Sequence, residues 1–341
     1  MTAVPLSVLD LAPVSSGRTT HQAMQESLTL ARHVEGLGYG RLWVAEHHGM
    51  PGIASSAPAV LIAALAAATS RIRVGSGGVM LPNHPPLVVA EQFGTLESLY
   101  PGRIDLGLGR APGTDQRTAS LLRRGDADDF PGELALLRAF LAGPVQGIAA
   151  VPTPLSSPEI WLLGSSGFSA ELAGLLGLPF AFAHHFSGEN TLAALELYRS
   201  SFRPGVLPAP YAMVCASVLI APSYDEARRL ALPGALAFVR LRQGLPGVFP
   251  SLEEAEAHDW TAQERAFAEY RMDGQVIGSP VEAREQLDRL LADTAADELM
   301  VVTATHDPEH RLRSYSLLAS MAAVVDGQLA ISASASAAAG R

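Results

Sequence analysis

Two pairs of histidines could transfer protons beside a bound ligand. Glu46-His47-His48 follows a predicted strand over 41–45, and His184-His185 follows another over 180–183. Histidine is the side chain whose charge changes most readily near neutral pH. Because adjacent strand residues face opposite sides, only one of His47 and His48 is expected to face such a ligand. A hydrogen-bond network at the strand end is the non-catalytic alternative for the first run.

A metal centre built from His47, His84 and His184 is a second interpretation of these residues. The sequence has no His-Glu-x-x-His helix and no paired cysteines, which are the usual zinc-binding spacings. Only Glu46 adds an acidic neighbour, so we predict no metal. Cys215, the single cysteine, lies in an apolar segment typical of a buried, unreactive thiol. No Gly-x-Ser-x-Gly turn of a serine hydrolase occurs.

A glycine-rich run over residues 74–82 ends a predicted strand. Glycines inside a strand weaken it, so several together indicate a bulge, a strained peptide or a flat ligand lying against the backbone. Tight packing between strands is the alternative. The run is not a dinucleotide-binding fingerprint, and neither is Gly107–Gly113, because neither matches Gly-x-Gly-x-x-Gly at the start of a helix.

Leu163–Phe168 joins a predicted strand to a predicted helix. Its two serines, two glycines and free helix N-terminal amides are suited to binding an anion. The sequence contains no lysine, so Arg110, at the end of an earlier strand, is the expected supporting charge. An ordinary serine-capped helix is the alternative.

Eight predicted strands alternate with helices and place these motifs at strand ends. The strands are expected over Leu6–Leu11, Arg41–Ala45, Ile72–Met80, Ile104–Leu108, Glu159–Leu163, Phe180–Ala183, Met213–Ala221 and Glu298–Thr303. This order predicts a single-domain α/β protein, a (β/α)8 TIM barrel over residues 1–331, with a doubly wound open sheet as competitor. Segments 111–158 and 243–278 exceed normal loop length and are predicted insertions. The tail 332–341 is expected to be disordered.

Composition narrows the class of partner. The 341 residues are 48% hydrophobic and carry a net charge of −10, which argues against nucleic acid and anionic membranes. The longest apolar run, Ala57–Thr69, is too short to cross a bilayer, and the N-terminus lacks a secretory pattern. One cysteine excludes an internal disulfide. We therefore expect a cytoplasmic protein.

Four of these segments, taken in order, resemble the bacterial luciferase-like flavin monooxygenase family. They are Trp43–His48, Gly75–Pro82, Tyr100–Arg110 and Leu163–Phe168, and the similarity runs from about Leu6 to Leu318. It is nearest to single-chain luciferase-like oxidoreductases whose glycine-rich third strand precedes Leu-Pro-Asn-His-Pro, here residues 81–85.

The resemblance implies bound FMN, delivered reduced by a separate flavin reductase. It makes Gly77–Gly78 a non-prolyl cis peptide supporting the isoalloxazine ring. It makes His47 the active-site histidine, assisted by His184. The other cofactor-binding positions that it implies are Met80 and Ala183 near the ring and Arg110, Gly164, Ser165, Ser166, Gly167 and Phe168 around the phosphate.

The implied reaction oxygenates a small organic substrate with O2 through a C4a-peroxyflavin, with segment 243–278 closing over the flavin. Gly109 stands where the luciferase catalytic subunit has a reactive cysteine, and Gly164 replaces a glutamate. Light emission with long aldehydes is therefore not expected. The family also implies a homodimer, to which helix Ala57–Ala68 could contribute.

Three other functions remain open at this stage. The same barrel hosts deazaflavin (F420) dehydrogenases, although the acidic net charge disfavours the anionic tail of that cofactor. A non-catalytic protein that sequesters a flavin and a metal-dependent barrel hydrolase are the others.

Overall fold

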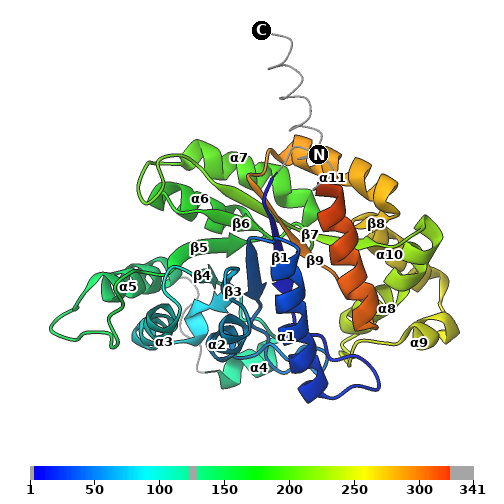
Figure 1. Ribbon diagram of the computed structural model, residues 1–341, viewed down its shortest axis with the longest axis horizontal. Helices are drawn as coiled ribbons and strands as arrows, with labels where there is room; N and C mark the ends of the chain where they lie inside the picture. Colours follow the sequence, from blue (N-terminus) through cyan, green and yellow to red (C-terminus); the bar gives the residue numbers. More distant parts are fainter. Residues whose placement is uncertain (1–3, 123–128, 323–341) are drawn as a thin grey trace, which may run out of the picture.

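Eight parallel strands close into a barrel in the computed structural model, which describes residues 4–122 and 129–322 (Figure 1). In the order of the ring, the strands are β6 (Phe180–Phe182), β5 (Glu159–Gly164), β4 (Ile104–Gly109), β3 (Arg73–Met80), β2 (Arg41–Val44), β1 (Leu6–Asp10), β9 (Glu298–Val302) and β7 (Ala212–Ile220). Pairing of β6 with β7 closes the ring. The predicted (β/α)8 barrel is confirmed, and the open sheet is excluded because its edge strands would stay unpaired.

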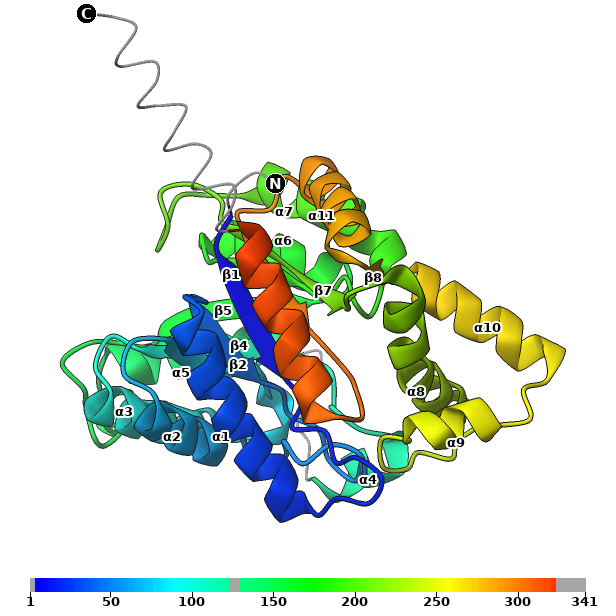
Figure 2. The same cartoon turned by 45° about the vertical axis from the view of Figure 1, so that its right-hand side comes forward.

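Helices surround the barrel on its outer side (Figures 1 and 2). They are α1 (Thr20–Gly36), α2 (Pro58–Ala68), α3 (Pro86–Leu99), α5 (Phe130–Ala142), α6 (Gly167–Leu176), α7 (Thr191–Ser201), α8 (Tyr224–Arg242), α11 (Pro280–Thr294) and a last helix over 308–322. Shorter elements are η1 (Leu81–Asn83), α4 (Gln116–Leu121), η3 (Gly188–Asn190), α9 (Leu252–Ala257), α10 (Ala262–Asp273) and β8 (Val276–Gly278). In the described part of the chain, no helix is both long and apolar enough to cross a membrane.

The two long segments differ in what they contribute. Within 111–158, α5 buries Phe130, Leu134 and Leu137 in the main core, so this part of the segment covers the barrel as its other helices do. Within 243–278, α9 and α10 pack on α8, and β8 extends the sheet beyond the ring by pairing with the end of β7. The predicted tail 332–341 lies outside the described residues.

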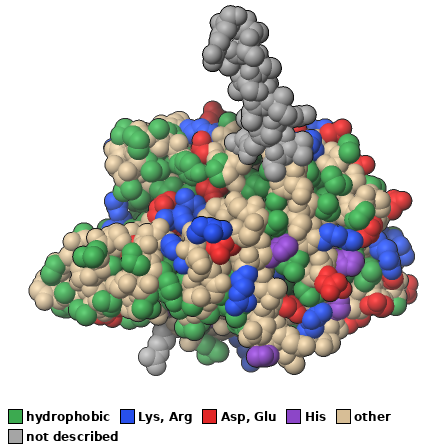
Figure 3. All heavy atoms as spheres, in the orientation of Figure 1, with side chains coloured by type: hydrophobic (Ala, Val, Ile, Leu, Met, Phe, Trp, Pro, Cys, Tyr) green, Lys and Arg blue, Asp and Glu red, His purple; other side chains and the backbone are tan. Residues whose placement is uncertain are grey.

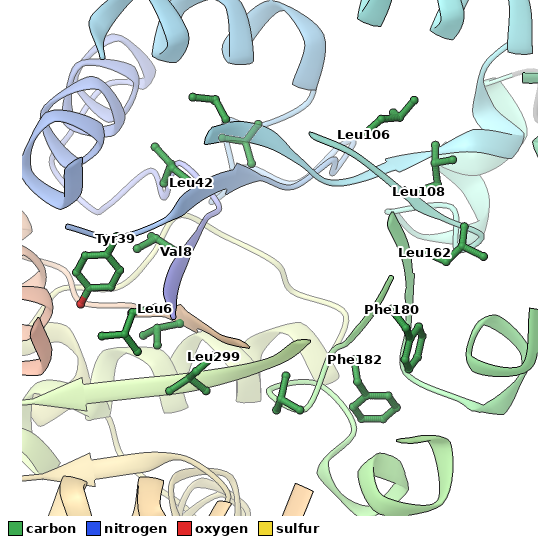
Figure 4. Packing of buried hydrophobic residues seen from close by; sticks show 14 of the residues in the cluster. Leu6, Val8, Tyr39, Leu42, Leu106, Leu108, Leu162, Phe180, Phe182 and Leu299 are labelled. Atoms are coloured by element: carbon green, nitrogen blue, oxygen red, sulfur yellow. The ribbon is translucent and has the colours of Figure 1, made fainter. Parts of the chain in front are cut away.

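Alternation along the strands builds a core on each side of the barrel wall. Leu42, Leu162 and Phe180 point from the strands toward the surrounding helices (Figure 4). The neighbouring Trp43 and Trp161 point inward and meet edge to face, with ring centroids 5.2 Å apart. This period of two is the geometry of any strand, and it fills the barrel interior with side chains.

The amino end of the barrel is closed by a buried ion network. The Asp105 carboxylate accepts hydrogen bonds from Arg41 Nη1 at 2.9 Å, from Arg73 Nε at 2.8 Å and from Trp43 Nε1 at 2.8 Å. Asp105 is fully buried. Arg41 also pairs with Glu159 and Glu298, and Arg73 with Glu159, so ion pairs fill this end of the barrel. Ligand chemistry is expected at the opposite, carboxyl end.

Candidate active site

The motifs at strand ends come together on the carboxyl rim of the barrel. Strand pairing places Met80 beside Gly109, and Gly164 beside Phe182. Gly77–Gly78, Arg110, Gly164–Phe168 and Ala183-His184 therefore stand on four neighbouring strands at the same end. The structure brings the predicted site residues of β3 to β6 together as parallel pairing requires.

The glycine run of β3 presents bare backbone. The Gly77–Gly78 peptide is cis, as the resemblance implies, and the register with β4 shifts between Ser76 and Val79. A methyl group at Gly78 would lie 2.8 Å from the Gly107 carbonyl oxygen. Tight strand packing, the alternative interpretation, thus contributes to this run. This packing involves the side of the glycine run that faces β4. It does not involve the side that faces the barrel mouth, where a ligand could bind.

Glu46 is a buried hub that joins the ends of β2 and β3. Its Oε2 accepts the Met80 amide at 2.9 Å, and its Oε1 accepts from His48 Nε2 at 2.8 Å, His84 Nε2 at 2.9 Å and Asn83 Nδ2 at 3.1 Å. Burial would raise the pKa of Glu46, but the hydrogen bonds and charge of His84, with the bonds from His48 and Met80, hold it below the ordinary 4.5. The hydrogen-bond alternative therefore accounts for His48. Nothing in the sequence indicates the contact between Asn83 and Glu46, and the sequence suggests His84 only as a candidate metal ligand.

His47 differs from its neighbour because its ring has an unused nitrogen. Its Nδ1 is buried and makes no hydrogen bond to any of the described residues. Burial lowers the pKa of His47, although the Glu46 charge opposes this shift. A neutral imidazole with one unpaired nitrogen is suited to hydrogen-bond a ligand or to exchange a proton with it.

Two more neutral histidines stand at the end of β6. His184 Nδ1 lies 2.8 Å from Thr191 Oγ1, and burial lowers its pKa. His185 Nδ1 lies 3.2 Å from the Cys215 carbonyl oxygen, and burial lowers its pKa to about 4. Arg271 on α10 donates to the His185 carbonyl at 2.8 Å, so segment 243–278 reaches the rim. Cys215 itself is buried, and burial raises the pKa of its thiol far above the ordinary value.

The turn after β5 leads into the N-terminus of α6. Ser166 is the extended N-cap residue, and its side chain makes no capping hydrogen bond to the helix, unlike that of a serine-capped helix. Arg110 lies over the Phe168 ring, with its Cζ 4.2 Å from the ring centroid. A guanidinium group beside free helix amides favours an anion. Together with the bare β3 backbone and His47, this fits a ligand that joins a flat ring to a phosphate, such as FMN.

A metal centre would need the ring nitrogens of His47, His84 and His184 to point at one ion. His84 is bonded to Glu46 and His184 to Thr191. Across residues 4–122 and 129–322, no three His, Cys, Asp or Glu side chains are placed to hold a metal ion.

Comparisons with known proteins find relatives along nearly the whole chain. A profile of luciferase-like monooxygenases matches residues 4–298. A luciferase-like monooxygenase of Escherichia coli (strain K12) is 47% identical over 320 residues, which cover 92% of this chain and 96% of the relative. N-acetyl-S-alkylcysteine monooxygenase of Bacillus subtilis (strain 168) is 34% identical over 326 residues, which cover 92% and 97%.

Solved structures share the fold. Apo-MsnO8 superposes with a TM-score of 0.85 at 40% identity, covering 93% of this chain and 98% of that one. The oxygenating constituent of 3,6-diketocamphane monooxygenase of Pseudomonas putida, solved with FMN, has a TM-score of 0.71 at 20% identity, with 93% and 97% covered. An F420-dependent secondary alcohol dehydrogenase has a TM-score of 0.66 at 15% identity, with 92% and 98% covered. At these identities, the last two show a common fold alone.

Proposed function

The chain belongs to the luciferase-like monooxygenase family, and on that premise we propose that it uses reduced FMN and O2 to oxygenate a small organic substrate. One observation carries the proposal. The side-chain-free backbone of Gly77–Gly78 and the anion site of Arg110 and α6 share one rim, with only β4 between β3 and β5. Two strand spacings amount to about 10 Å, a distance that one mononucleotide can span.

Each residue of the rim has a proposed role in holding the cofactor. Gly77, Gly78, Met80 and Ala183 would lie against the ring. Arg110 and the residues Gly164, Ser165, Ser166, Gly167 and Phe168 would bind the phosphate through the guanidinium, the hydroxyls and the helix amides. FMN, when bound and reduced, supplies the activation of O2 that no side chain can supply.

His47 would act on the reacting part of the ligand. Among the residues proposed for the site, His47 contributes a buried Nδ1 that makes no hydrogen bond to the described residues. Because its pKa is lowered, His47 is neutral at pH 7 and can donate or accept one hydrogen bond there. His184, held by Thr191, would assist, and α10 would limit the entry of water through its contact at His185.

Titration of the purified protein with FMN and with F420 tests the cofactor. We expect saturable FMN binding that Arg110→Ala weakens at least tenfold, because a charge-assisted phosphate contact is lost. Arg289→Ala, at an exposed position on α11, is the matched control. Saturation by F420 alone would replace this proposal with a dehydrogenase.

Turnover tests the activity. With a flavin reductase supplying reduced FMN, we expect O2 uptake coupled to product, and His47→Ala should uncouple the two. Equal coupling in that variant would remove His47 from the mechanism. Tight binding of oxidised FMN without turnover would instead identify a flavin-sequestering protein.

A homodimer is part of the proposal. Val60 on α2 and Val88 and Leu99 on α3 are exposed apolar side chains. Further apolar side chains are spread over the lobe at the left of Figure 3, among other side chains and backbone. Exposed apolar surface of this kind marks interaction sites. Light scattering at two protein concentrations measures the mass, and a monomer at both would exclude the dimer.

A further inference from the structure

A cavity of about 230 Å³ lies at the carboxyl ends of β1 and β9, beside the residues already assigned. Apolar side chains line most of it, among them Leu11, Ile53, Phe238, Leu241, Phe249 and Val302. Helix α8 forms one wall, and the segment that follows α8 covers the cavity through Phe249. The cavity is partly open to solvent, so a small molecule can enter it.

The cavity adjoins the barrel interior. Leu11 and Val302 line it and also pack in the interior cluster with Cys215. Leu9, the preceding inward residue of β1, lies so near β3 that a methyl group at Gly77 would come within 2.9 Å of its Cδ1. Successive inward residues of a strand are only about 6.6 Å apart. The cavity therefore borders the proposed ring site, across the barrel from β5 and the phosphate site.

The one charged side chain among the described lining residues of the cavity is paired with a carboxylate of the protein. Among its described lining residues, only Arg311 is charged. Its Nη2 donates to Asp10 Oδ1 at 2.7 Å and its Nε to the Thr303 carbonyl at 3.1 Å, and Arg311 and Asp10 are both buried. The guanidinium charge is thus neutralised within the protein. An ionised ligand would lose its hydration here without gaining a counter-charge.

Volume sets the size of the occupant. An apolar protein cavity of about 150 Å³ takes one benzene molecule. In proportion, this cavity takes roughly nine non-hydrogen atoms, and a longer chain would extend through the open side.

We infer that this cavity is the substrate site and that the substrate is an uncharged, predominantly hydrocarbon molecule, an inference that rests on the proposed function. Its position provides contact with the ring site, its lining selects apolar groups, and its neutral wall excludes carboxylates and amines. Arg271 connects the cavity to the rim. Its Cζ lies 4.6 Å from the ring centroid of Phe238, and its Nη1 donates to the His185 carbonyl oxygen.

Calorimetric titration with linear alkanols and alkanoates tests the chemical class. The protein is loaded with oxidised FMN, and the probes run from 1-butanol to 1-decanol with the matching carboxylates at pH 8. We expect affinity to rise about fourfold per methylene, the gain for burying one CH₂, and to level off near 1-octanol. Octanoate should bind at least roughly tenfold more weakly than 1-octanol. Equal binding of the two would overturn the inference.

A filled cavity tests the location. Gly234 lines the cavity, and a methyl group there would meet only Phe249 Cζ, at an ordinary 3.8 Å. Gly234→Leu should therefore fold, retain FMN binding and lose at least tenfold in affinity for 1-octanol. Gly36→Leu, at the end of α1 with open space around it, is the matched control. Unchanged octanol binding by Gly234→Leu would show that the probe binds elsewhere.

Failure of the two proposals gives different results. The alkanol series is repeated on flavin-free protein, and FMN binding is measured separately. Loss of FMN binding with an intact alkanol series would contradict the proposed function. FMN binding without any preference for uncharged probes would contradict the cavity assignment.

Discussion

Replacing Glu46 with glutamine tests whether this hub maintains the join between β2 and β3. Four donors surround the carboxylate: the Met80 amide on Oε2, and His48, His84 and Asn83 on Oε1. A glutamine of the same shape keeps one acceptor oxygen and introduces an NH₂ group. Whichever way the amide is turned, that NH₂ faces the N–H of Met80 or of Asn83.

The size of the effect follows from the donors left without an acceptor. A buried hydrogen-bonding group that loses its partner costs about 1–3 kcal/mol. We expect the free energy of unfolding of Glu46→Gln to fall by roughly 2 kcal/mol, which lowers Tm by roughly 3 °C in a chain of this size. FMN affinity should fall as well, because Met80 and the glycines before it are held by this bond.

Urea unfolding and thermal melting measure the change, with Glu97→Gln as the matched control. Glu97 is equally buried, and its Oε1 accepts from the Gly102 amide at 2.7 Å and from Ser156. Its Oε2 has no hydrogen-bond partner within the described residues. The glutamine NH₂ can take that position without meeting a donor, so this control should lose less than about 1 kcal/mol.

The pH dependence adds a second measurement on the same pair of proteins. The pKa of Glu46 is held below 4.5 in the folded chain, so its carboxylate contributes stability above that pH, and this contribution is lost as the pH falls through the folded pKa. The stability gap between the wild type and Glu46→Gln should therefore narrow as the pH is lowered from 6 toward the folded pKa. A Tm within 1 °C of wild type, or a gap that widens on acidification, would refute this account of the hub.

Two further changes test the backbone of β3 and the amino end of the barrel. Gly78→Ala should lower the free energy of unfolding by about 1–3 kcal/mol, because the added methyl would lie 2.8 Å from the Gly107 carbonyl oxygen. FMN binding should weaken as well. An unchanged urea midpoint would contradict this close approach. Asp105→Asn should destabilise by about 1–3 kcal/mol, because Arg41 and Arg73 lose hydrogen bonds to a shared buried carboxylate but keep their ion pairs with Glu159. FMN affinity per folded molecule should not change.

The fold could be predicted because its signals are local. Each predicted barrel strand overlaps an observed one, since short apolar runs between Gly- and Pro-rich turns and helical segments mark the alternation of a barrel. The helix α5 received no prediction because it lies within a long segment rich in Pro and Gly that we predicted as an insertion. The strand β8 received none because it has only three residues. The local pattern therefore predicts the repeated strand–helix units of the barrel better than the elements that lie in the long connecting segments.

The site was predictable to the extent that it lies at strand ends. The predicted site residues follow or end a strand, and parallel pairing brings such ends to one rim. They are His47, Gly77–Gly78, Arg110 and Gly164–Phe168. The contact of Glu46 with His84 joins residues 38 positions apart, and no spacing in the sequence indicates it. The individual roles that we assigned at the rim remain proposals.

The sequence by itself determined the alternation of strands and helices, the absence of lysine and the positions of the glycine, serine and histidine motifs, because periodicity and composition are properties of neighbouring residues. The pairing of β6 with β7, which closes the barrel and excludes an open sheet, is a property of the tertiary structure. Only the tertiary structure decided that His47 keeps a buried ring nitrogen without a hydrogen bond to the described residues, that Arg311 pairs with Asp10, and that Leu11, Phe238 and Val302 line one cavity. These facts depend on distances between side chains far apart in the chain, and the packing of the whole barrel sets those distances.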